Sequence, residues 1–395
     1  MDISEIIKNY DLNNLTVGVL GGHSALDVCR GAKKYGFKTV AVCRKGREKT
    51  FAKYYKSREE DGKELGCVDE TILVDKFEDV LLPENQETLR KMNTIFIGSR
   101  YWWVYFSNFD KVENEFEVPF YGSRGLVKLE ERDQPNNQYV LLEKAGIRIP
   151  NIIREGDSGM NDDELKTALD NHFVKEKGGP LLVKVNEAIR GYERAFFIIT
   201  REREYFDISK KMLEEGKITQ EDLNKAVIEE FVIGAQINYN FFYSPLSERL
   251  ELMGTDTRRQ TSLDGFLRLD AGTQQLLLDK GYKPTMIETG HIACTCKESL
   301  LEKAFEAGEK FVETMKKEVP PGMIGPFALQ GAIGSYDGKE EFVVFDVSMR
   351  IPGSPGTPFT PYSGYLHGES VSYGERIAME LKSTIKKEKL IEVLS

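Results

Sequence analysis

The chain has 395 residues, of which 40% are hydrophobic and 30% charged, and its net charge is −10. Because single cores stop growing near ~250–300 residues, this length predicts two or three domains. No segment reaches the ~18 apolar residues of a membrane span, and no basic run matches a nucleic-acid backbone, so neither partner is expected. Five scattered cysteines and the lack of a secretion signal predict reduced thiols and a cytoplasmic location.

The first third of the chain alternates predicted strands with helices. A helix is predicted at residues 25–35, and runs rich in β-branched residues predict strands at residues 15–20, 38–43, 71–75 and 93–97. Such alternation is typical of an α/β fold with a parallel sheet covered on both faces. Ligands of these sheets bind beyond the carboxyl ends of the strands, where residues 21–24 and 98–99 fall.

The middle of the chain predicts a hairpin with a long loop. Its strands are residues 180–185 and 195–200, and the loop at residues 188–194 is long enough to act as a lid. Around this hairpin the sequence predicts helices at residues 138–145, 204–215 and 220–226, and a strand at residues 227–233.

The last part of the chain is predicted to be rich in strands. Residues 256–265 are polar and predict a turn-rich segment, and residues 352–364 predict a loop rich in Gly and Pro. An amphipathic helix is expected at residues 300–319, a terminal helix from Gly374, and strands at residues 236–243, 250–254, 325–333 and 341–347. Asp337-Gly338 predicts the hairpin turn between the last two strands.

Polar groups on this last hairpin indicate metal and phosphate chemistry. Asp346, Ser348 and Arg350 alternate, so they are expected on one face of an apolar strand, and Gln330 lies on the neighbouring strand. Gln330 and Asp346 supply the oxygen ligands that Mg²⁺ prefers, and Arg350 suits a transferring phosphoryl group as a catalytic residue. An ion pair on a half-exposed sheet remains the structural alternative.

A second set of candidates surrounds the predicted hairpin of the middle region. Lys184 interrupts an apolar strand, and a buried lysine needs an anion such as a triphosphate. Glu229 and Glu230 precede Phe231 and Val232, whose extended backbone can pair with an adenine edge. An exposed lysine and a strand flanked by solvated acids explain the same residues without a ligand.

These strands together resemble the ATP-grasp superfamily, whereas no Gly-Lys-Ser/Thr phosphate loop is present. Further motifs resemble the archaeal PurP family over nearly the whole chain. They include Gly22-His23-Ser24-Ala25-Leu26, Pro361-Tyr362-Ser363 and Val319-Pro-Pro-Gly-Met-Ile-Gly-Pro-Phe327. The resemblance implies an ATP-grasp fold with an N-terminal parallel α/β domain at residues 1–122, a small lobe at 123–235 and a large lobe with the metal site at 236–395.

The resemblance also implies a reaction and its ligands. The family's type enzyme is a formate–phosphoribosylaminoimidazolecarboxamide ligase of purine (IMP) synthesis, which uses ATP with Mg²⁺, or Mn²⁺ in its place. Formate attacks the γ-phosphate of ATP, and the 5-amino group of the aminoimidazole carboxamide ribotide attacks the formyl phosphate. A homo-oligomer is expected. The implied substrate contacts are His23, Ser24, Ser99 and His291, and the implied ATP contacts are Lys184, Arg190, Glu229, Glu230, Phe231, Val232 and Gln260.

His23 has two interpretations from the residues alone. A histidine after Gly-Gly at the end of a strand is either a helix cap or a phosphate ligand, and the resemblance favours ligand contact.

The sequence departs from the family pattern around these ligands. Residues 186–195 are bulkier than the family's glycine- and arginine-rich loop, His291 replaces an asparagine, and Gln260 replaces a glutamate. The loop after Arg350 is shortened and rich in proline. The departures leave two alternatives open besides the formate ligase: a relative that ligates another acid or amine, and a nucleotide-binding protein without turnover.

Overall fold

The computed structural model describes residues 3–131, 134–156, 158–185 and 195–395. The chain packs into two compact units. Unit 1 comprises residues 1–147, 236–331 and 346–395, and unit 2 comprises residues 148–235 and 332–345. The three predicted domains stay a prediction, because the two units are defined by contacts within the chain and not by function.

Unit 1 contains the predicted parallel sheet. Its strand order is β5-β2-β1-β6-β7, and each neighbouring pair is parallel. β1 is buried along its whole length, as its β-branched run predicts for a sheet covered on both faces. The bounds are β1 Thr16–Leu20, β2 Lys38–Arg44, β5 Glu70–Val74, β6 Thr94–Ile97 and β7 Phe120–Tyr121, with a separate pair of β3 Arg58–Glu60 and β4 Lys63–Leu65.

Two helices of unit 1 cross at very short range. α2 (Ala25–Lys34) packs against α14 (Tyr373–Lys386) in an apolar core of the unit. A Cβ atom on Gly31 would lie 2.0 Å from the backbone of Gly374, and one on Gly374 would lie 2.0 Å from that of Asp27. Only glycine allows this approach, which brings the backbone of α2 against the start of α14.

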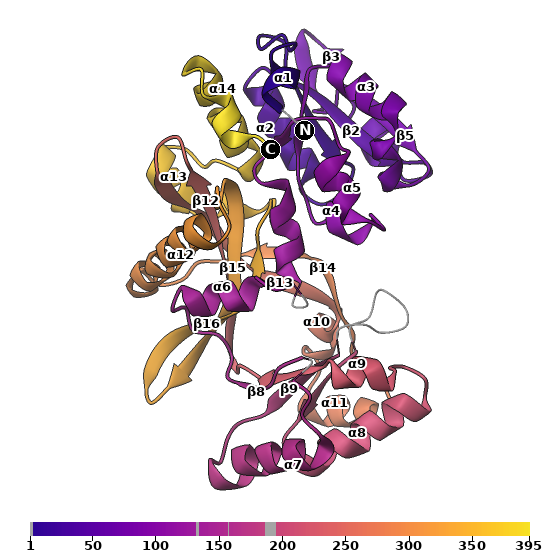
Figure 1. The fold of residues 1–395 in the computed structure, drawn as a ribbon, viewed down its shortest axis with the longest axis vertical. Helices are drawn as coiled ribbons and strands as arrows, with labels where there is room; N and C mark the ends of the chain where they lie inside the picture. The colour runs from indigo at the N-terminus through magenta and orange to yellow at the C-terminus, as the bar shows by residue number, and fades with distance from the viewer. Residues whose placement is uncertain (1–2, 132–133, 157, 186–194) are drawn as a thin grey trace. The chain divides into compact units, whose positions relative to one another are not determined.

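The second sheet of unit 1 has the strand order β14-β13-β12-β15-β16, and β15 and β16 extend into unit 2 (Figure 1). Phe311 of α12 and Phe241 of β12 both stack on Phe327 of β15, so this helix covers one face of the sheet. Positive φ angles of 50° at Asp337 and 76° at Gly338 form the predicted turn between β15 and β16. The bounds are β12 Gly234–Ser244, β13 Arg249–Ser262, β14 Met286–Ala293, β15 Gly325–Tyr336, β16 Lys339–Ser348 and α12 Glu298–Glu318.

One expectation for this sheet is wrong. Residues 256–265 were expected to form turns, but β13 continues to Ser262 and a short helix, α10 (Leu263–Phe266), follows. The strand pairs with β14 from Asp256 to Ser262. A polar pattern that is typical of solvent-exposed turns thus forms part of a strand here, because it pairs with β14.

Unit 2 is built on an antiparallel sheet with the order β10-β9-β11-β8. The predicted hairpin is confirmed as β9 and β10, whereas the lid loop at residues 188–194 lies outside the described residues. β11 ends at Glu230, earlier than expected, because its next partner is Pro180, which has no N–H to donate. The bounds are β8 Ile152–Arg154, β9 Leu181–Val185, β10 Ala195–Ile199, β11 Val227–Glu230, α7 Asp162–Asp170, α8 Glu202–Glu214 and α9 Gln220–Asn224.

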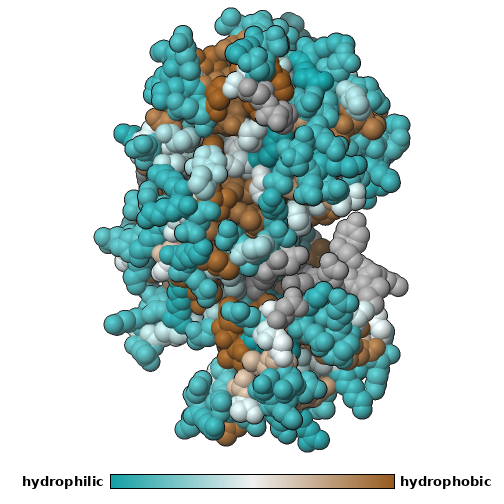
Figure 2. All heavy atoms as spheres, viewed as in Figure 1, coloured by the Kyte–Doolittle hydropathy of each residue, from teal (hydrophilic) through white to brown (hydrophobic). Residues whose placement is uncertain are grey.

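The remaining helices belong to unit 1. They are α1 Ile3–Ile7, α3 Pro83–Lys91, α4 Tyr101–Val104, α5 Phe109–Asn114, α6 Gln138–Lys144, α11 Ala271–Asp279 and α13 Tyr362–His367. Single 3₁₀ or π segments lie at Thr50–Tyr54, Phe77–Leu81, Arg124–Glu130, Asn171–Lys175, Thr357–Phe359 and Leu390–Val393. Hydrophilic residues cover most of the face seen in Figure 2. Within the described ranges, no helix combines the length and the apolar character of a membrane span.

Candidate active site

The carboxyl ends of β1 and β6 form one edge of the candidate site. His23 and Ser24 follow β1, Ser99 follows β6, and all three line one small cavity. The Ser24 hydroxyl donates a hydrogen bond of 2.6 Å to the carbonyl oxygen of Pro352. Ser99 is only 8% exposed, and its hydroxyl has no hydrogen-bond partner among the described residues. A buried hydroxyl without a partner is costly, so this edge is suited to a polar ligand.

The loop after β16 joins this edge to the second sheet. A Cβ atom on Gly353 would lie 3.1 Å from His23 Nδ1, so only a residue without a side chain fits easily beside the imidazole. The hydroxyl of Ser354 donates a 2.6 Å hydrogen bond to Asp256 on β13. Two consecutive residues of this loop therefore contact groups from the two sheets of unit 1.

His291 on β14 is held between two carboxylates. Its Nδ1 pairs with the buried Asp256, and its Nε2 lies 2.9 Å from Glu288 Oε1. Burial would lower the pKa of the imidazole, but the hydrogen bonds that its ring nitrogens make to Asp256 and Glu288 outweigh it and raise the pKa to about 9. His291 is thus a cation at neutral pH with both ring nitrogens in use, which leaves its predicted contact with substrate a prediction.

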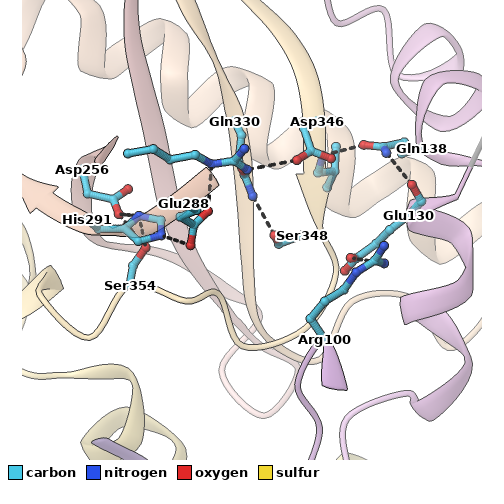
Figure 3. A network of polar contacts seen from close by, with 12 residues as sticks. Arg100, Glu130, Gln138, Asp256, Glu288, His291, Gln330, Asp346, Ser348 and Ser354 are labelled. Carbon is cyan, nitrogen blue, oxygen red and sulfur yellow. Dashed lines mark hydrogen bonds and ion pairs between the residues drawn. The ribbon is translucent and has the colours of Figure 1, made fainter. Parts of the chain in front are cut away.

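The two predicted metal ligands lie together and share one arginine. Arg258 of β13 reaches β15 and β16, where its Nη2 donates to Gln330 Oε1 and to Asp346 Oδ2, the latter at 3.2 Å. The Gln330 amide nitrogen in turn donates to the Ser348 hydroxyl at 2.6 Å. Figure 3 shows Gln330, Asp346 and Ser348 close together, with His291 and Glu288 beside them.

Arg350, predicted to be catalytic, lies just beyond the end of β16. Its Nη2 is 3.2 Å from Glu130 Oε2, and the same oxygen accepts a hydrogen bond of 3.1 Å from Arg100. Burial raises the pKa of Glu130, although Arg350 and Arg100 counteract it. Three arginines, counting Arg258, therefore approach the end of this sheet, which favours anionic ligands such as phosphate and carboxylate.

Unit 2 carries the predicted nucleotide contacts that the structure describes, apart from Gln260, which belongs to unit 1. Lys184 of β9 forms an ion pair with Glu229 of β11, and the two side chains are 8% and 1% exposed. Glu230 accepts a 2.6 Å hydrogen bond from the Tyr336 hydroxyl. Burial and this contact raise the pKa of Tyr336 to about 12.

The remaining predicted nucleotide contacts are less well defined. The backbone N–H of Phe231 already donates to Pro180, which reduces what this stretch can offer an adenine edge. Val232 follows the end of β11, and the backbone N–H of Gln260 on β13 donates to Asp264 at 3.3 Å. Arg190 lies outside the described residues. The roles of these residues stay predictions.

Sequence reasoning missed Arg258 and both carboxylates around His291. The signal that could have revealed them is the alternation of Asp256 and Arg258, which places both side chains on one face of a strand. That signal was lost because the segment was interpreted as turns. Glu288 lies on β14, an edge strand that was not predicted.

The chemistry of Gln330 and Asp346 fits a magnesium ion. Both present an oxygen atom to the same cationic group, and amide and carboxylate oxygens are ligands that Mg²⁺ accepts. In the part of the chain that the structure describes, no three His, Cys, Asp or Glu residues gather as a metal site. Magnesium requires few protein ligands because waters and nucleotide phosphates complete its shell.

Comparison with known proteins identifies the family. Two family models match, one described as a protein of unknown function (DUF1246) at residues 17–153 and one as a domain of unknown function (DUF1297) at residues 204–395. Two proteins named 5-formaminoimidazole-4-carboxamide-1-(β)-D-ribofuranosyl 5′-monophosphate synthetase, from Methanothermobacter thermautotrophicus and Methanobrevibacter smithii, are 34% and 36% identical to this chain over 399 residues. Each match covers 100% of this chain and 98% of the relative. The chain belongs to this synthetase family.

Solved structures agree with the synthetase assignment. The IMP biosynthesis protein PurP from Thermococcus kodakaraensis aligns with a TM-score of 0.65 and 26% identity, covering 96% of this chain and 100% of that one. N5-carboxyaminoimidazole synthetase from Staphylococcus aureus aligns with a TM-score of 0.56 and 15% identity, over 93% and 77% of the two chains. The predicted ATP-grasp fold is confirmed, as is membership of an ATP-dependent carbon–nitrogen ligase family.

The structural neighbours also include a protein solved with nucleotide. The biotin carboxylase domain of Hydrogenobacter thermophilus 2-oxoglutarate carboxylase, in complex with MgADP, ADP and bicarbonate, aligns with a TM-score of 0.57 and 14% identity, over 92% and 69% of the two chains. At that identity the likeness shows only the shared fold, which in that protein holds MgADP.

Proposed function

We propose that this synthetase uses ATP to join formate to the 5-amino group of aminoimidazole carboxamide ribotide in IMP synthesis. The observation that supports this proposal most strongly is the match over the full chain to relatives whose name states the formylated product. In the proposed reaction an oxygen of formate attacks the γ-phosphorus, and ADP leaves. The amine then attacks the formyl carbon, and phosphate leaves as the carbon–nitrogen bond forms.

Each group of residues has a proposed part in this reaction. Gln330 and Asp346 would hold Mg²⁺, which neutralises charge on the phosphate oxygens when it is bound. Lys184 would bind ATP phosphates. Arg350 would stabilise the transferring phosphoryl group from beside its Glu130 partner.

The edge formed by His23, Ser24 and Ser99 would bind the ribotide. The unpartnered Ser99 hydroxyl offers a donor to a phosphate or ribose oxygen, and the first turn of α2 begins at the same place. Helix N-termini present N–H groups that favour anions. A formate-derived acyl phosphate also needs protection from water, and this edge lies beside the buried loop contacts of Ser354 and Asp256.

The test is an assay of three products. The protein is incubated with ATP, Mg²⁺, formate and the aminoimidazole ribotide, and we expect ADP, phosphate and the formylated ribotide in equal amounts. Omitting formate should abolish all three. If none of the three forms at saturating substrates, the proposed reaction is wrong.

A second candidate is a synthetase that ligates a different acid or amine. The observation that favours it is His291, whose two ring nitrogens are bound by carboxylates rather than offered to a substrate. ADP release that depends on another carboxylate, and not on formate, would support this candidate. Use of Mn²⁺, a homo-oligomeric state and a cytoplasmic location stay predictions.

A further inference from the structure

Arg258 occupies a cation position built by three different strands. Its guanidinium contacts Gln330 on β15 and Asp346 on β16, and its Nε lies 3.4 Å from Glu288 Oε2 on β14. The side chain comes from β13, which lies next to β14 in the same sheet. Oxygen-bearing side chains from three separate strands thus surround one cationic group. Figure 3 labels the three residues that supply these oxygens, Glu288, Gln330 and Asp346.

The Gln330 amide is oriented for this cation by a second hydrogen bond. Its nitrogen donates to Ser348 Oγ, which turns its oxygen toward Arg258. The two oxygens that receive Arg258 Nη2, from Gln330 and Asp346, are the same side-chain groups proposed to hold Mg²⁺. A guanidinium and a divalent ion cannot both bind these groups, because their charges repel at such a distance.

We propose that Arg258 is a built-in competitor for the metal site, which it occupies until a metal–nucleotide complex displaces its guanidinium. This inference rests on the metal site of the proposed function. Without nucleotide, Arg258 neutralises Asp346 and uses the Gln330 oxygen, so a free divalent ion binds weakly. Nucleotide phosphates add ligands to the ion and an anionic partner for the displaced arginine, so metal and nucleotide bind together.

The exposure of the cluster permits this exchange. The side chain of Arg258 is 26% exposed and that of Asp346 is 34% exposed, so the ion pair is not closed off from solvent. The Glu288 carboxylate pairs with Arg258 through Oε2 and with His291 through Oε1, so His291 keeps this partner when Arg258 moves. Displacing Arg258 therefore breaks its contacts with Gln330 and Asp346 and leaves the ion pair between His291 and Glu288 in place.

The experiment measures Mn²⁺ binding to the full chain by electron paramagnetic resonance, with and without ADP. Arg258→Met removes the charge and keeps the length of the side chain. Without ADP, this variant should bind Mn²⁺ at least about tenfold more tightly than the wild type, because a unit positive charge next to the ion is gone. With ADP, the difference between the two proteins should shrink to within about threefold, since nucleotide phosphates displace Arg258 in the wild type.

Arg259→Met is the matched control. Arg259 is the next residue of β13 and pairs with Asp264 at 3.4 Å, so its replacement removes one positive charge from the same strand and leaves the oxygen cluster intact. We expect no more than a twofold change in Mn²⁺ affinity for this variant, because exposed charges are screened. An equal gain in both variants would overturn the proposal by showing a general charge effect.

Two further results separate this inference from the function it rests on. If the wild type binds Mn²⁺ with ADP but Arg258→Met gains nothing without ADP, the inference is wrong and the metal site stands. If no protein binds Mn²⁺ with ADP, the metal site itself fails and the inference falls with it. Arg258→Lys, which keeps a cation on a shorter side chain, should give an intermediate affinity and serves if the Met variant does not fold; an affinity equal to the wild type's would overturn the proposal.

Discussion

Two ion pairs of this chain, one in each unit, differ in how deeply their side chains are buried. In unit 2, Lys184 and Glu229 face each other diagonally across β9 and β11 and are almost completely buried. In unit 1, the Arg258 guanidinium meets Asp346 where both side chains are about one-quarter to one-third exposed. The first pair is largely withdrawn from solvent, whereas the second is partly open to it.

Burial determines what each cluster contributes. Removing one partner of a buried ion pair leaves an uncompensated charge in a medium of low polarity, so stability falls steeply. A half-exposed pair is screened by water, so its loss costs little stability, and its groups are free to change partners. We therefore expect changes at Lys184 to affect folding first, and changes at Asp346 to affect turnover first.

The largest expected effect is on stability, at Lys184. Lys184→Met should lower the free energy of unfolding by about 3–5 kcal/mol, because Glu229 remains buried without its cation. The double variant Lys184→Met with Glu229→Gln should recover much of this loss, since neither position of the pair then carries a charge. Urea denaturation, followed by circular dichroism, measures the free energy of unfolding of the single and the double variant. Lys210→Met, at an exposed pair with Glu214, is the control and should cost under about 0.5 kcal/mol.

A loss that is equal in Lys184→Met and Lys210→Met would contradict the contrast between buried and exposed pairs. A double variant no more stable than the single one would show that packing, and not the unpaired charge, causes the loss.

The second effect is on turnover, at Asp346. Asp346→Asn keeps the size of the side chain and removes its charge, so metal placement weakens and turnover should fall by a factor on the order of 10²–10³. Its stability should change by less than about 1 kcal/mol, because its pair with Arg258 is half-exposed. The readouts are ADP formation and thermal unfolding. Glu313→Gln, at an exposed pair on α12, should leave turnover unchanged.

Full turnover by Asp346→Asn would exclude this carboxylate from the metal site. A fall in turnover matched by a large fall in melting temperature would instead indicate a structural role for Asp346.

The third effect depends on pH and arises at His291. Its pKa in the folded chain is about 9, above the ordinary value of 6.5, so its ion pairs stabilise the fold fully below pH 6.5. This contribution is lost as pH rises through 9. The difference in unfolding free energy between the wild type and His291→Gln should therefore be constant at low pH and shrink between pH 6.5 and about 9.5. A difference that does not change over this range would show that His291 is not charged in the folded chain.

Much of this fold follows from local sequence patterns. The buried β-branched run of β1 predicts the parallel sheet, and Asp337-Gly338 predicts the β15–β16 hairpin, because both signals lie within a few consecutive residues. The same hairpin brings Gln330 and Asp346 to one arginine, as expected for two groups that share a site.

The remainder of the site depends on pairing between distant segments. The polar residues of β13 become a strand because β14, 24 to 37 residues later, pairs with them from Ser262↔Met286 to Asp256↔Ala293. Asp256 meets His291 and Ser354 through that pairing and through the loop after β16. No local pattern encodes such contacts, so Arg258 could not be predicted from the sequence, whereas its two acceptors, Gln330 and Asp346, stand out as polar groups on an apolar hairpin. Their role as metal ligands stays a prediction.

The smallest expected effect is on stability, at the hydrogen bond between Tyr336 and Glu230. It tests whether the burial of a polar pair in unit 2 sets the free energy lost when the pair is broken. The Tyr336 hydroxyl donates to Glu230 at 2.6 Å, but Glu230 also accepts from the backbone of Asn151 at 3.2 Å, and both side chains are half-buried. Tyr336→Phe removes one hydrogen bond and keeps the ring on which the Arg148 guanidinium lies, 3.7 Å from the centroid. The free energy of unfolding should fall by about 1 kcal/mol or less, because water and Asn151 still satisfy the carboxylate. A loss as large as that of Lys184→Met would mean that contact geometry, and not burial, sets the cost of breaking a polar pair in this unit.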